Sequence, residues 1–183
     1  MNWGSLTDVE VISSGGYANV RVVGAGGNDV IDLRNVTSTG IAAVDGGAGI
    51  DRIRGTSGAD TIIGNTGNDL ITGGQGADVL TGGPGADIFF YEGGIDSREM
   101  FGIDTITDFK SGTDRIDLSA APAYFGTKFH FVGDATTGAA GEIWTTRVGG
   151  DTMLSLEFGN DKVFDVQIMF PGHVSFSAAD FIF

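Results

Sequence analysis

The chain has 183 residues, enough to bury one substantial hydrophobic core. Its formal net charge is -14, and its acidic residues are nineteen aspartates and five glutamates. This charge disfavours nucleic acid and anionic lipid as partners and favours cations. Cysteine is absent, which excludes disulfides and thiolate zinc sites. Neither an apolar run of about eighteen residues nor a basic leader occurs, so we expect no membrane span and no ordinary signal peptide.

The first 45 residues contain two short strand-like runs, VEVIS at residues 9–13 and VRVV at residues 20–23. GAGGNDVID follows at residues 24–32 and is a degenerate copy of the repeat found downstream, with Asp29 as an additional candidate metal ligand. Residues 33–45 interrupt the repeat. We therefore expect residues 1–45 to form irregular β-solenoid coils or an N-terminal cap.

Residues 46–90 are five uninterrupted copies of a nine-residue repeat. Glycine occupies positions one and four and usually two, aspartate occupies position six, and a large apolar residue occupies position eight. Glycine at this density disfavours helix, at a cost of about 1 kcal/mol each, and the last three residues of each copy predict a short strand. The copies are GGAGIDRIR, GTSGADTII, GNTGNDLIT, GGQGADVLT and GGPGADIFF.

The spacing explains why the aspartate recurs. Three strand residues and six loop residues make half a turn of a flattened spiral, so alternate copies stack as parallel strands about 4.8 Å apart. Glycine lets the loop carbonyls turn inward toward the stacked carboxylates. An all-oxygen cage of flexible geometry favours calcium over zinc, copper or magnesium. The predicted pairs are Asp51 with Asp69, Asp69 with Asp87, and Asp60 with Asp78.

Two further aspartates follow the strict repeat. Continuing the count reaches Asp96, which would pair with Asp78, and Asp104, which would close a site opposite Asp87. A simpler interpretation makes all these aspartates turn formers that bond to their own backbone. We favour calcium because turns also tolerate asparagine, serine or glycine at position six, whereas all five copies keep aspartate.

The pattern GGxGxDxUx, in which U is a large apolar residue, resembles the nonapeptide of the repeats-in-toxin family of exported bacterial proteins. Residues 94–120 resemble the segment that follows the calcium roll in serralysin-type metalloproteases and, more loosely, the repeat modules of alginate epimerases. The final SAADFIF resembles the uncleaved C-terminal signal that type I secretion systems read.

This resemblance implies an all-β fold: a right-handed parallel β-roll at residues 46–104, followed by a β-rich, sandwich-like cap at residues 105–183. It also implies that loop carbonyls at positions one, two and four join the aspartates in binding several calcium ions, about four to five. The implied ligands are Gly46, Gly47, Gly49, Asp51, Gly55, Thr56, Gly58, Asp60, Gly64, Asn65, Gly67, Asp69, Gly73, Gly74, Gly76, Asp78, Gly82, Gly83, Gly85, Asp87, Asp96 and Asp104.

The C-terminal half has a different composition, because all thirteen phenylalanines lie at Phe89 or later. Aromatic and β-branched runs at residues 128–132, 152–158 and 163–170 predict antiparallel strands. Outward positions of the first strict copy carry Arg52 and Arg54, whereas those of the last carry Ile88 and Phe90. We therefore expect the C-terminal region to cover the late end of the roll.

No catalytic motif is evident. The chain has two histidines, and it lacks both H-E-x-x-H and G-x-S-x-G. His130 alternates within a strand-like run, and His173 lies in a turn-like PGHVS. We expect this chain not to be an enzyme, although it could be the C-terminal part of a larger exoenzyme or toxin.

The leading hypothesis is a non-catalytic calcium-binding module of a secreted or cell-surface protein. It would leave the cell through type I secretion machinery and fold on calcium outside. A first alternative is a carbohydrate-binding accessory module of a polysaccharide-modifying enzyme, with Tyr124, Trp144 and Arg147 as candidate contacts for extracellular polysaccharide; core or cap positions explain these three equally well. A second alternative is a calcium-dependent surface-layer or adhesin end-piece.

Overall fold

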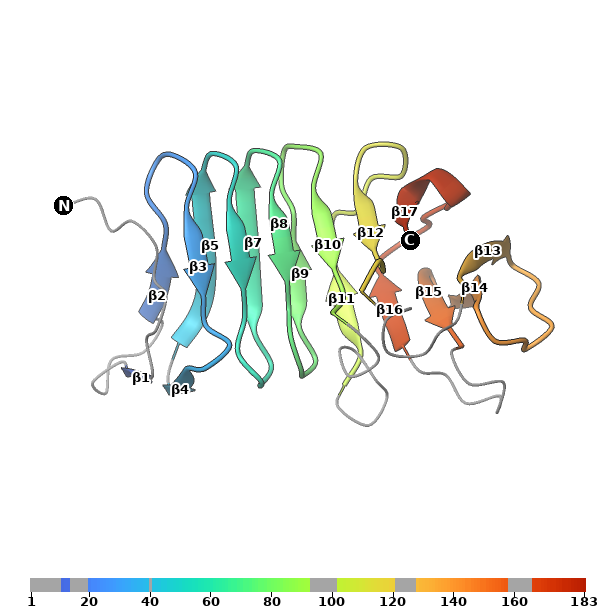
Figure 1. The fold of residues 1–183 in the computed structure, drawn as a ribbon, viewed down its shortest axis with the longest axis horizontal. Helices are drawn as coiled ribbons and strands as arrows, with labels where there is room; N and C mark the ends of the chain where they lie inside the picture. The colour runs from blue at the N-terminus through green and yellow to red at the C-terminus, as the bar shows by residue number, and fades with distance from the viewer. Residues whose placement is uncertain (1–10, 14–19, 40, 93–101, 121–127, 158–165) are drawn as a thin grey trace.

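The computed structural model describes residues 11–13, 20–39, 41–92, 102–120, 128–157 and 166–183. Within these ranges the chain forms β-strands and one short 3₁₀ helix, η1 (Ala178–Asp180), which confirms the predicted all-β class. Two long sheets contain most of the strands, and β1 (Val11–Ser13) pairs with β4 (Thr37–Thr39) separately. Figure 1 shows the strands of the two long sheets stacked side by side along the long axis.

The first sheet has six strands, and all of them run parallel to their neighbours. In spatial order they are β17 (Phe181–Ile182), β12 (Arg115–Asp117), β10 (Ile88–Phe90), β8 (Leu70–Thr72), β6 (Arg52–Arg54) and β3 (Val30–Asp32).

The second sheet has nine strands, which are parallel in the repeat region and antiparallel between β14, β15 and β16. In spatial order they are β13 (His130–Gly133), β14 (Glu142–Val148), β15 (Asp151–Leu156), β16 (Val166–Phe170), β11 (Asp104–Ile106), β9 (Val79–Thr81), β7 (Thr61–Thr66), β5 (Ile41–Ala48) and β2 (Val20–Val23).

Consecutive repeats alternate between the two sheets, as the half-turn spacing requires. In the first sheet Ile53 of β6 lies opposite Ile71 of β8, and in the second sheet Ile62 of β7 lies opposite Leu80 of β9. Both offsets are eighteen residues, which is two copies of the repeat. The chain therefore forms a β-roll in which copies n and n+2 are neighbouring strands of one sheet.

The core of the roll is a single file of apolar side chains from position eight. Their exposed fractions are 1% or less, because the two sheets face each other and enclose them. Each strand contributes only one such side chain, so the core is narrow compared with that of a typical sandwich. These residues are Ile53, Ile62, Ile71, Leu80 and Phe89.

The two sheets of the roll extend beyond the five strict repeats at both ends. Toward the N-terminus, β3 pairs with β6, and β2 pairs with β5, which itself pairs with β7. Toward the C-terminus, β11 pairs with β9 and β12 pairs with β10. The segments that the repeat count treats as irregular or post-repeat therefore add strands to the same two sheets.

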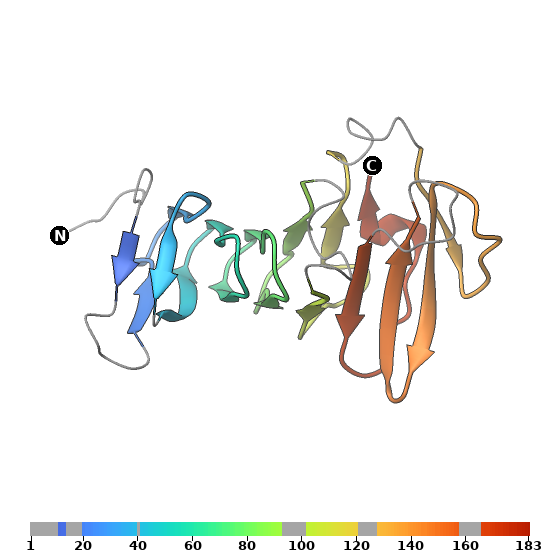
Figure 2. The ribbon, with the colours of Figure 1, turned by 90° about the horizontal axis from the view of Figure 1, so that it is seen from below.

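The C-terminal region covers the late end of the roll, as predicted. Strand β16 pairs with β11, and β17, at the very end of the chain, pairs with β12. Figure 2 shows β14, β15 and β16 standing beside this end as a set of longer strands. Within the described ranges, no helix has the length and apolar character that crossing a bilayer requires.

A phenylalanine cluster joins the roll to this region. Phe109 lies 6.2 Å from Phe89 of the roll core and 5.4 Å from Phe170 of β16, measured between ring centroids. Phe176 lies 4.9 Å from Phe170 and 5.9 Å from Phe181. The late phenylalanines thus extend the core of the roll into the cap.

Candidate metal sites

The repeat aspartates form two ladders, one at the start of each sheet's strands. In the first ladder, the backbone N–H of each aspartate donates to Oδ1 of the aspartate one coil later. The N···O distances are 2.8 Å from Asp29 to Asp51, 2.8 Å from Asp51 to Asp69, 2.9 Å from Asp69 to Asp87, and 3.1 Å from Asp87 to Asp114. Two of the predicted pairs, Asp51 with Asp69 and Asp69 with Asp87, are therefore in contact.

The second ladder follows the same rule on the other sheet. The backbone N–H of Asp60 donates to Oδ1 of Asp78 at 2.8 Å, and that of Asp78 donates to Oδ1 of Asp104 at 3.0 Å. The predicted pairing of Asp60 with Asp78 is present. Asp78 and Asp104 thus each use Oδ1 to hold the preceding coil.

The second oxygen has no protein donor in the middle of the first ladder. Oδ2 of Asp51, Asp69 and Asp87 is buried and accepts no hydrogen bond within the part of the chain that the structure describes. A buried carboxylate oxygen without a donor is costly, and a cation or a proton is the usual way to offset that cost. These three oxygens are the strongest structural indication of metal binding.

Carbonyl oxygens gather beside the same carboxylates. A Cβ atom on Gly64 would lie 2.5 Å from Asp69 Oδ2 and 2.6 Å from the carbonyl oxygen of Gly82. A Cβ atom on Gly46 would likewise lie 2.7 Å from Asp51 Oδ2 and 2.9 Å from the Gly64 carbonyl oxygen. Only glycine fits at position one, because a side chain there would fill the space between the oxygens.

Position two requires an unusual backbone angle as well as space. Gly47, Gly74 and Gly83 have positive φ angles of 94°, 102° and 97°, and Asn65 adopts a φ of 70° in the same role. Asparagine tolerates this region better than most residues, so its loop keeps the shape of the glycine loops.

Thr56 is the other departure at position two, and its loop differs. Its backbone N–H and its hydroxyl both donate to Asp60 Oδ2, at 2.7 and 2.9 Å. Asp29 and Asp114, which stand at the two ends of the first ladder, also have a donor for Oδ2. The backbone N–H of Ala25 donates to Asp29 at 2.6 Å, and that of Lys110 donates to Asp114 at 2.8 Å. The oxygens without donors therefore lie between stacked loops, and the satisfied ones lie in loops of divergent sequence.

Burial acts on the pKa values of the ladder carboxylates. Desolvation raises the pKa of Asp51, Asp60, Asp69 and Asp114, and it raises the pKa of Asp87 to about 6, with smaller contributions from neighbouring carboxylates at Asp87. The charged form is thus disfavoured in the metal-free roll. A bound cation would reverse this effect because it favours the charged form.

No three acidic or histidine side chains converge on one point within the described ranges. A metal bound at the ladders would need backbone carbonyls as further ligands, as the glycine pattern predicts. Oxygen-only donor sets with a minority of carboxylates match calcium better than transition metals.

The aspartates beyond the strict repeat pair differently from the prediction. Asp104 lies against Asp78, not Asp87, because the segment between β9 and β11 changes the offset from eighteen residues to twenty-six. The partner of Asp87 is Asp114, which the repeat count missed. Asp96 lies outside the described residues. The signal for Asp114 was present in TDRID, which matches the order of IDRIR around Asp51.

Asp108 is a second residue that the repeat count missed. Its carboxylate accepts the backbone N–H groups of Gly82 and Gly83, at 2.9 and 2.8 Å. It therefore holds the loop before Asp87, at the end of the roll where no further regular loop follows.

The family described as Peptidase M10 serralysin C terminal matches residues 11–183. The chain belongs to the serralysin C-terminal family. The resemblance predicted from the nonapeptides and from residues 94–120 is thereby confirmed.

Two solved structures from Azotobacter vinelandii are similar to this serralysin C-terminal chain. One is the R3 subunit of the mannuronan C5-epimerase AlgE6, with a TM-score of 0.51, 26% identity, and coverage of 93% of this chain and 82% of that one. The R2 subunit of the same epimerase has a TM-score of 0.47, 26% identity and coverage of 89% and 92%. No curated protein sequence matches the chain. The family and the first of these structures support a calcium-binding β-roll repeat module.

Two of the three candidate carbohydrate contacts lie in β14. Trp144 is buried in β14, and Arg147 is exposed near the end of the same strand. Tyr124 lies outside the described residues. His130 lies in β13 as predicted, and His173 lies in the loop after β16.

Proposed function

We propose that the chain is a non-catalytic calcium-binding module of a secreted or cell-surface protein, and that calcium drives its folding outside the cell. The observation that carries the proposal is the set of buried Oδ2 atoms of Asp51, Asp69 and Asp87, which no described donor satisfies. Several calcium ions, about four to five, would bind between stacked loops. Each would use carboxylate oxygens and the loop carbonyls of positions one, two and four.

The mechanism follows from charge and from the narrow core. Without calcium, stacked carboxylates are desolvated close to one another, and three-residue strands bury too little apolar surface to offset chain entropy. Calcium binds the folded roll and not the unfolded chain, so it drives folding by mass action. Extracellular calcium modules work at about 0.1–1 mM, well above the cytosolic concentration, so the chain would stay unfolded until export.

Export through a type I secretion system is part of the same proposal. The final residues form β17, and Asp180 accepts hydrogen bonds from Gly112 N–H and the Ser111 hydroxyl at 2.7 and 2.8 Å. An export signal at this end would therefore be accessible in the unfolded chain and paired in the folded one. Deleting residues 177–183 should abolish export from a cell that carries the secretion system, and unchanged export would refute this part.

A calcium titration tests the folding proposal. Far-UV circular dichroism starting from a calcium-free sample should show a cooperative gain of β signal with calcium and none with magnesium at the same concentrations. An unchanged β spectrum would mean that the roll stands without metal and that the aspartates are turn formers.

The second candidate function is a carbohydrate-binding accessory module. Two observations favour it: the similarity to a subunit of a mannuronan epimerase, and a cavity in the cap that contains a charged side chain beside aromatic rings. Calorimetry with acidic oligosaccharides at saturating calcium tests it, and absence of binding heat would count against it.

A further inference from the structure

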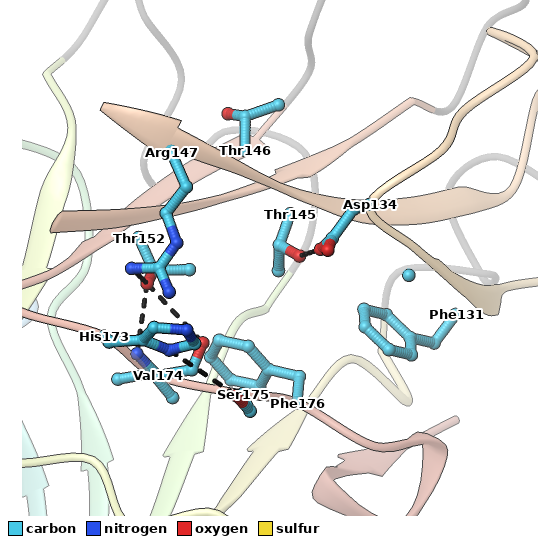
Figure 3. A pocket seen from close by; sticks show the side chains of 11 residues that line it. Phe131, Asp134, Thr145, Thr146, Arg147, Thr152, His173, Val174, Ser175 and Phe176 are labelled. Carbon is cyan, nitrogen blue, oxygen red and sulfur yellow. Dashed lines mark hydrogen bonds between the residues drawn. The ribbon is translucent and has the colours of Figure 1, made fainter. Parts of the chain in front are cut away.

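A cavity of about 480 Å³ opens in the cap, away from both aspartate ladders. This volume lies in the range of small-molecule sites. Its walls are formed by the C-terminal part of β14, the start of β15 and the loop after β16. Phe131 and Gly133 of β13 complete the lining. The lining includes Phe131, Asp134, Thr146, Arg147, His173 and Phe176, which Figure 3 shows around the cavity.

Buried hydrogen bonds hold the walls in place. Thr152, which is only 2% exposed, accepts hydrogen bonds from Arg147 Nη1 at 3.2 Å and from the backbone N–H of Val174 at 3.1 Å, and donates to the Gly172 carbonyl at 3.0 Å. Asp151 accepts the N–H of Gly172 at 2.8 Å. One threonine therefore fixes both the guanidinium and the loop that carries His173.

The two ends of the cavity differ in charge. Arg147 and His173 line one end, and Asp134, which accepts the Thr145 hydroxyl hydrogen bond, lines the other (Figure 3). Arg147 is the only arginine after Arg115 in a chain of net charge -14, and no carboxylate of the described residues lies within ion-pair distance of it. A guanidinium with N–H donors that no described residue accepts is suited to a bidentate carboxylate.

The remainder of the lining suits a ligand that is both apolar and rich in hydroxyl groups. Phe131 and Phe176 are half-buried, with ring centroids 6.5 Å apart and an interplanar angle of 59°, and they present apolar surface to the cavity. Thr146 and Ser175 add exposed hydroxyls, and Asp134 adds an acceptor. Pyranose rings combine a C–H face, which packs on aromatic rings, with hydroxyls that donate and accept.

We propose that this cavity binds a sugar residue bearing a carboxylate. The carboxylate lies on Arg147, the C–H face packs against Phe131 and Phe176, and a ring hydroxyl donates to Asp134. The inference rests on the second candidate function, a carbohydrate-binding module, and assigns it a site in the cap that is separate from the calcium ladders.

Digalacturonate is the probe, titrated into the calcium-saturated chain and followed by backbone amide NMR. Its neutral methyl ester and alanyl-alanine serve as control ligands. We expect digalacturonate to shift the amides of residues 145–147 and 172–176, with much smaller shifts from the ester. Arg147→Ala should weaken binding roughly tenfold or more, because it removes a hydrogen-bonded charge partner.

Two further variants separate the site from general charge and folding effects. Lys128→Ala removes one positive charge from the same cap outside the cavity and should change affinity less than about twofold. Arg147→Lys keeps the charge but loses the planar fork, so its affinity should fall between wild type and Arg147→Ala. Both Arg147 variants should keep the wild-type calcium titration curve.

Three outcomes would overturn the inference. Binding that Arg147→Ala leaves unchanged would place the carbohydrate site elsewhere while the second candidate function survives. No binding of digalacturonate at all would remove both the site and that function. Tighter binding of alanyl-alanine than of digalacturonate would identify the cavity as a site for a zwitterion bridging Arg147 and Asp134.

Discussion

The centre of the first aspartate ladder and the Glu142 loop of the cap bury carboxylates in opposite ways. In the cap, Glu142 accepts hydrogen bonds from the hydroxyls of Thr136 and Thr137 and from backbone N–H groups of the same loop. In the roll, the buried Oδ2 atoms of Asp51 and Asp69 accept no hydrogen bond from the described residues. A buried acid that the protein satisfies itself stabilises a loop, whereas an acid left without a donor requires a proton or a cation.

The pKa values follow this difference. Hydrogen bonds from Thr136 and Thr137 lower the pKa of Glu142 to about 2. Burial acts to raise the pKa of Asp180, but hydrogen bonds from Ser177, Gly112 and Ser111 outweigh it and lower the pKa below its ordinary value. Burial instead raises the pKa of Asp87 to about 6. The charged form is therefore favoured at Glu142 and Asp180 of the cap and disfavoured at Asp87 of the metal-free roll.

The largest expected effect comes from breaking the cap through its apolar core. Phe170 is fully buried and contacts Phe109 and Phe176 edge-on or nearly so. Phe170→Ala should lower the free energy of unfolding by about 3–5 kcal/mol, measured by urea denaturation at saturating calcium. Phe183→Ala, at a half-exposed position, should cost much less; equal losses would contradict the assignment of the cap core.

The second-largest effect is expected from a substitution in the centre of the first ladder of the roll. Asp69 contacts both Asp51 and Asp87 and so belongs to two stacked pairs. Asp69→Ala should raise the calcium concentration at the midpoint of the folding titration roughly a hundredfold, which is about tenfold for each of the two sites. Asp117→Ala removes an acid at the far end of β12, outside the ladders, and should leave the midpoint unchanged. An unchanged midpoint in Asp69→Ala would contradict the stacking account.

A smaller effect is expected at Asp114, at the end of the roll that the cap covers. Asp114 ends the first ladder and pairs only with Asp87, and its second oxygen is already bonded to the Lys110 N–H. Asp114→Ala should therefore shift the calcium midpoint by roughly tenfold or less, clearly less than Asp69→Ala. The reverse order of the two variants would show that the ladder end contributes more than its centre.

The smallest effect is a pH dependence of opposite sign in the two regions. The pKa of Asp87 is higher in the folded chain than its ordinary 3.8, so its contribution to the metal-free roll is fully present below 3.8 and is lost as pH rises through about 6. The pKa of Glu142 is lower than its ordinary 4.5, so its contribution is present above 4.5 and is lost as pH falls through about 2.

Raising the pH from 4.5 to 7 without calcium should therefore destabilise the roll and leave the Glu142 loop unaffected. Far-UV circular dichroism of calcium-free protein at several pH values measures this as the residual β signal, with Asp87→Asn as the control that should reduce its dependence on pH. Stability that increases with pH over this interval would contradict the pKa assignment.

The sequence predicts the roll well because its geometry is periodic. Position eight predicts the core file, and an eighteen-residue offset predicts the contacts of Asp51, Asp60 and Asp69 with the next coil. Prediction weakens where the period changes. The offset becomes twenty-six residues at β11 and twenty-seven at β12, which places Asp104 against Asp78 and Asp114 against Asp87. The length of an irregular loop does not show which strand the chain will pair with next.

The cap illustrates a second limit. Alternating aromatic runs indicated strands there, but not that β16 would pair with β11 of the roll or that β17 would pair with β12. Such pairings depend on contacts between residues more than sixty positions apart, which local patterns do not encode. Trp144 is a related case, because an aromatic residue in a strand is compatible with exposure or burial, and the structure buries it.

Hydrogen exchange of individual amides, with and without calcium, is the sharpest test of calcium-driven folding of the roll. Calcium should raise the protection of the ladder amides, each of which donates to the next coil, by far more than it raises the protection of β14 and β15. The ladder amides are those of Asp51, Asp60, Asp69 and Asp78. Equal protection of the ladder amides in calcium and in chelator would show that the roll is held by its backbone alone and would contradict calcium-driven folding.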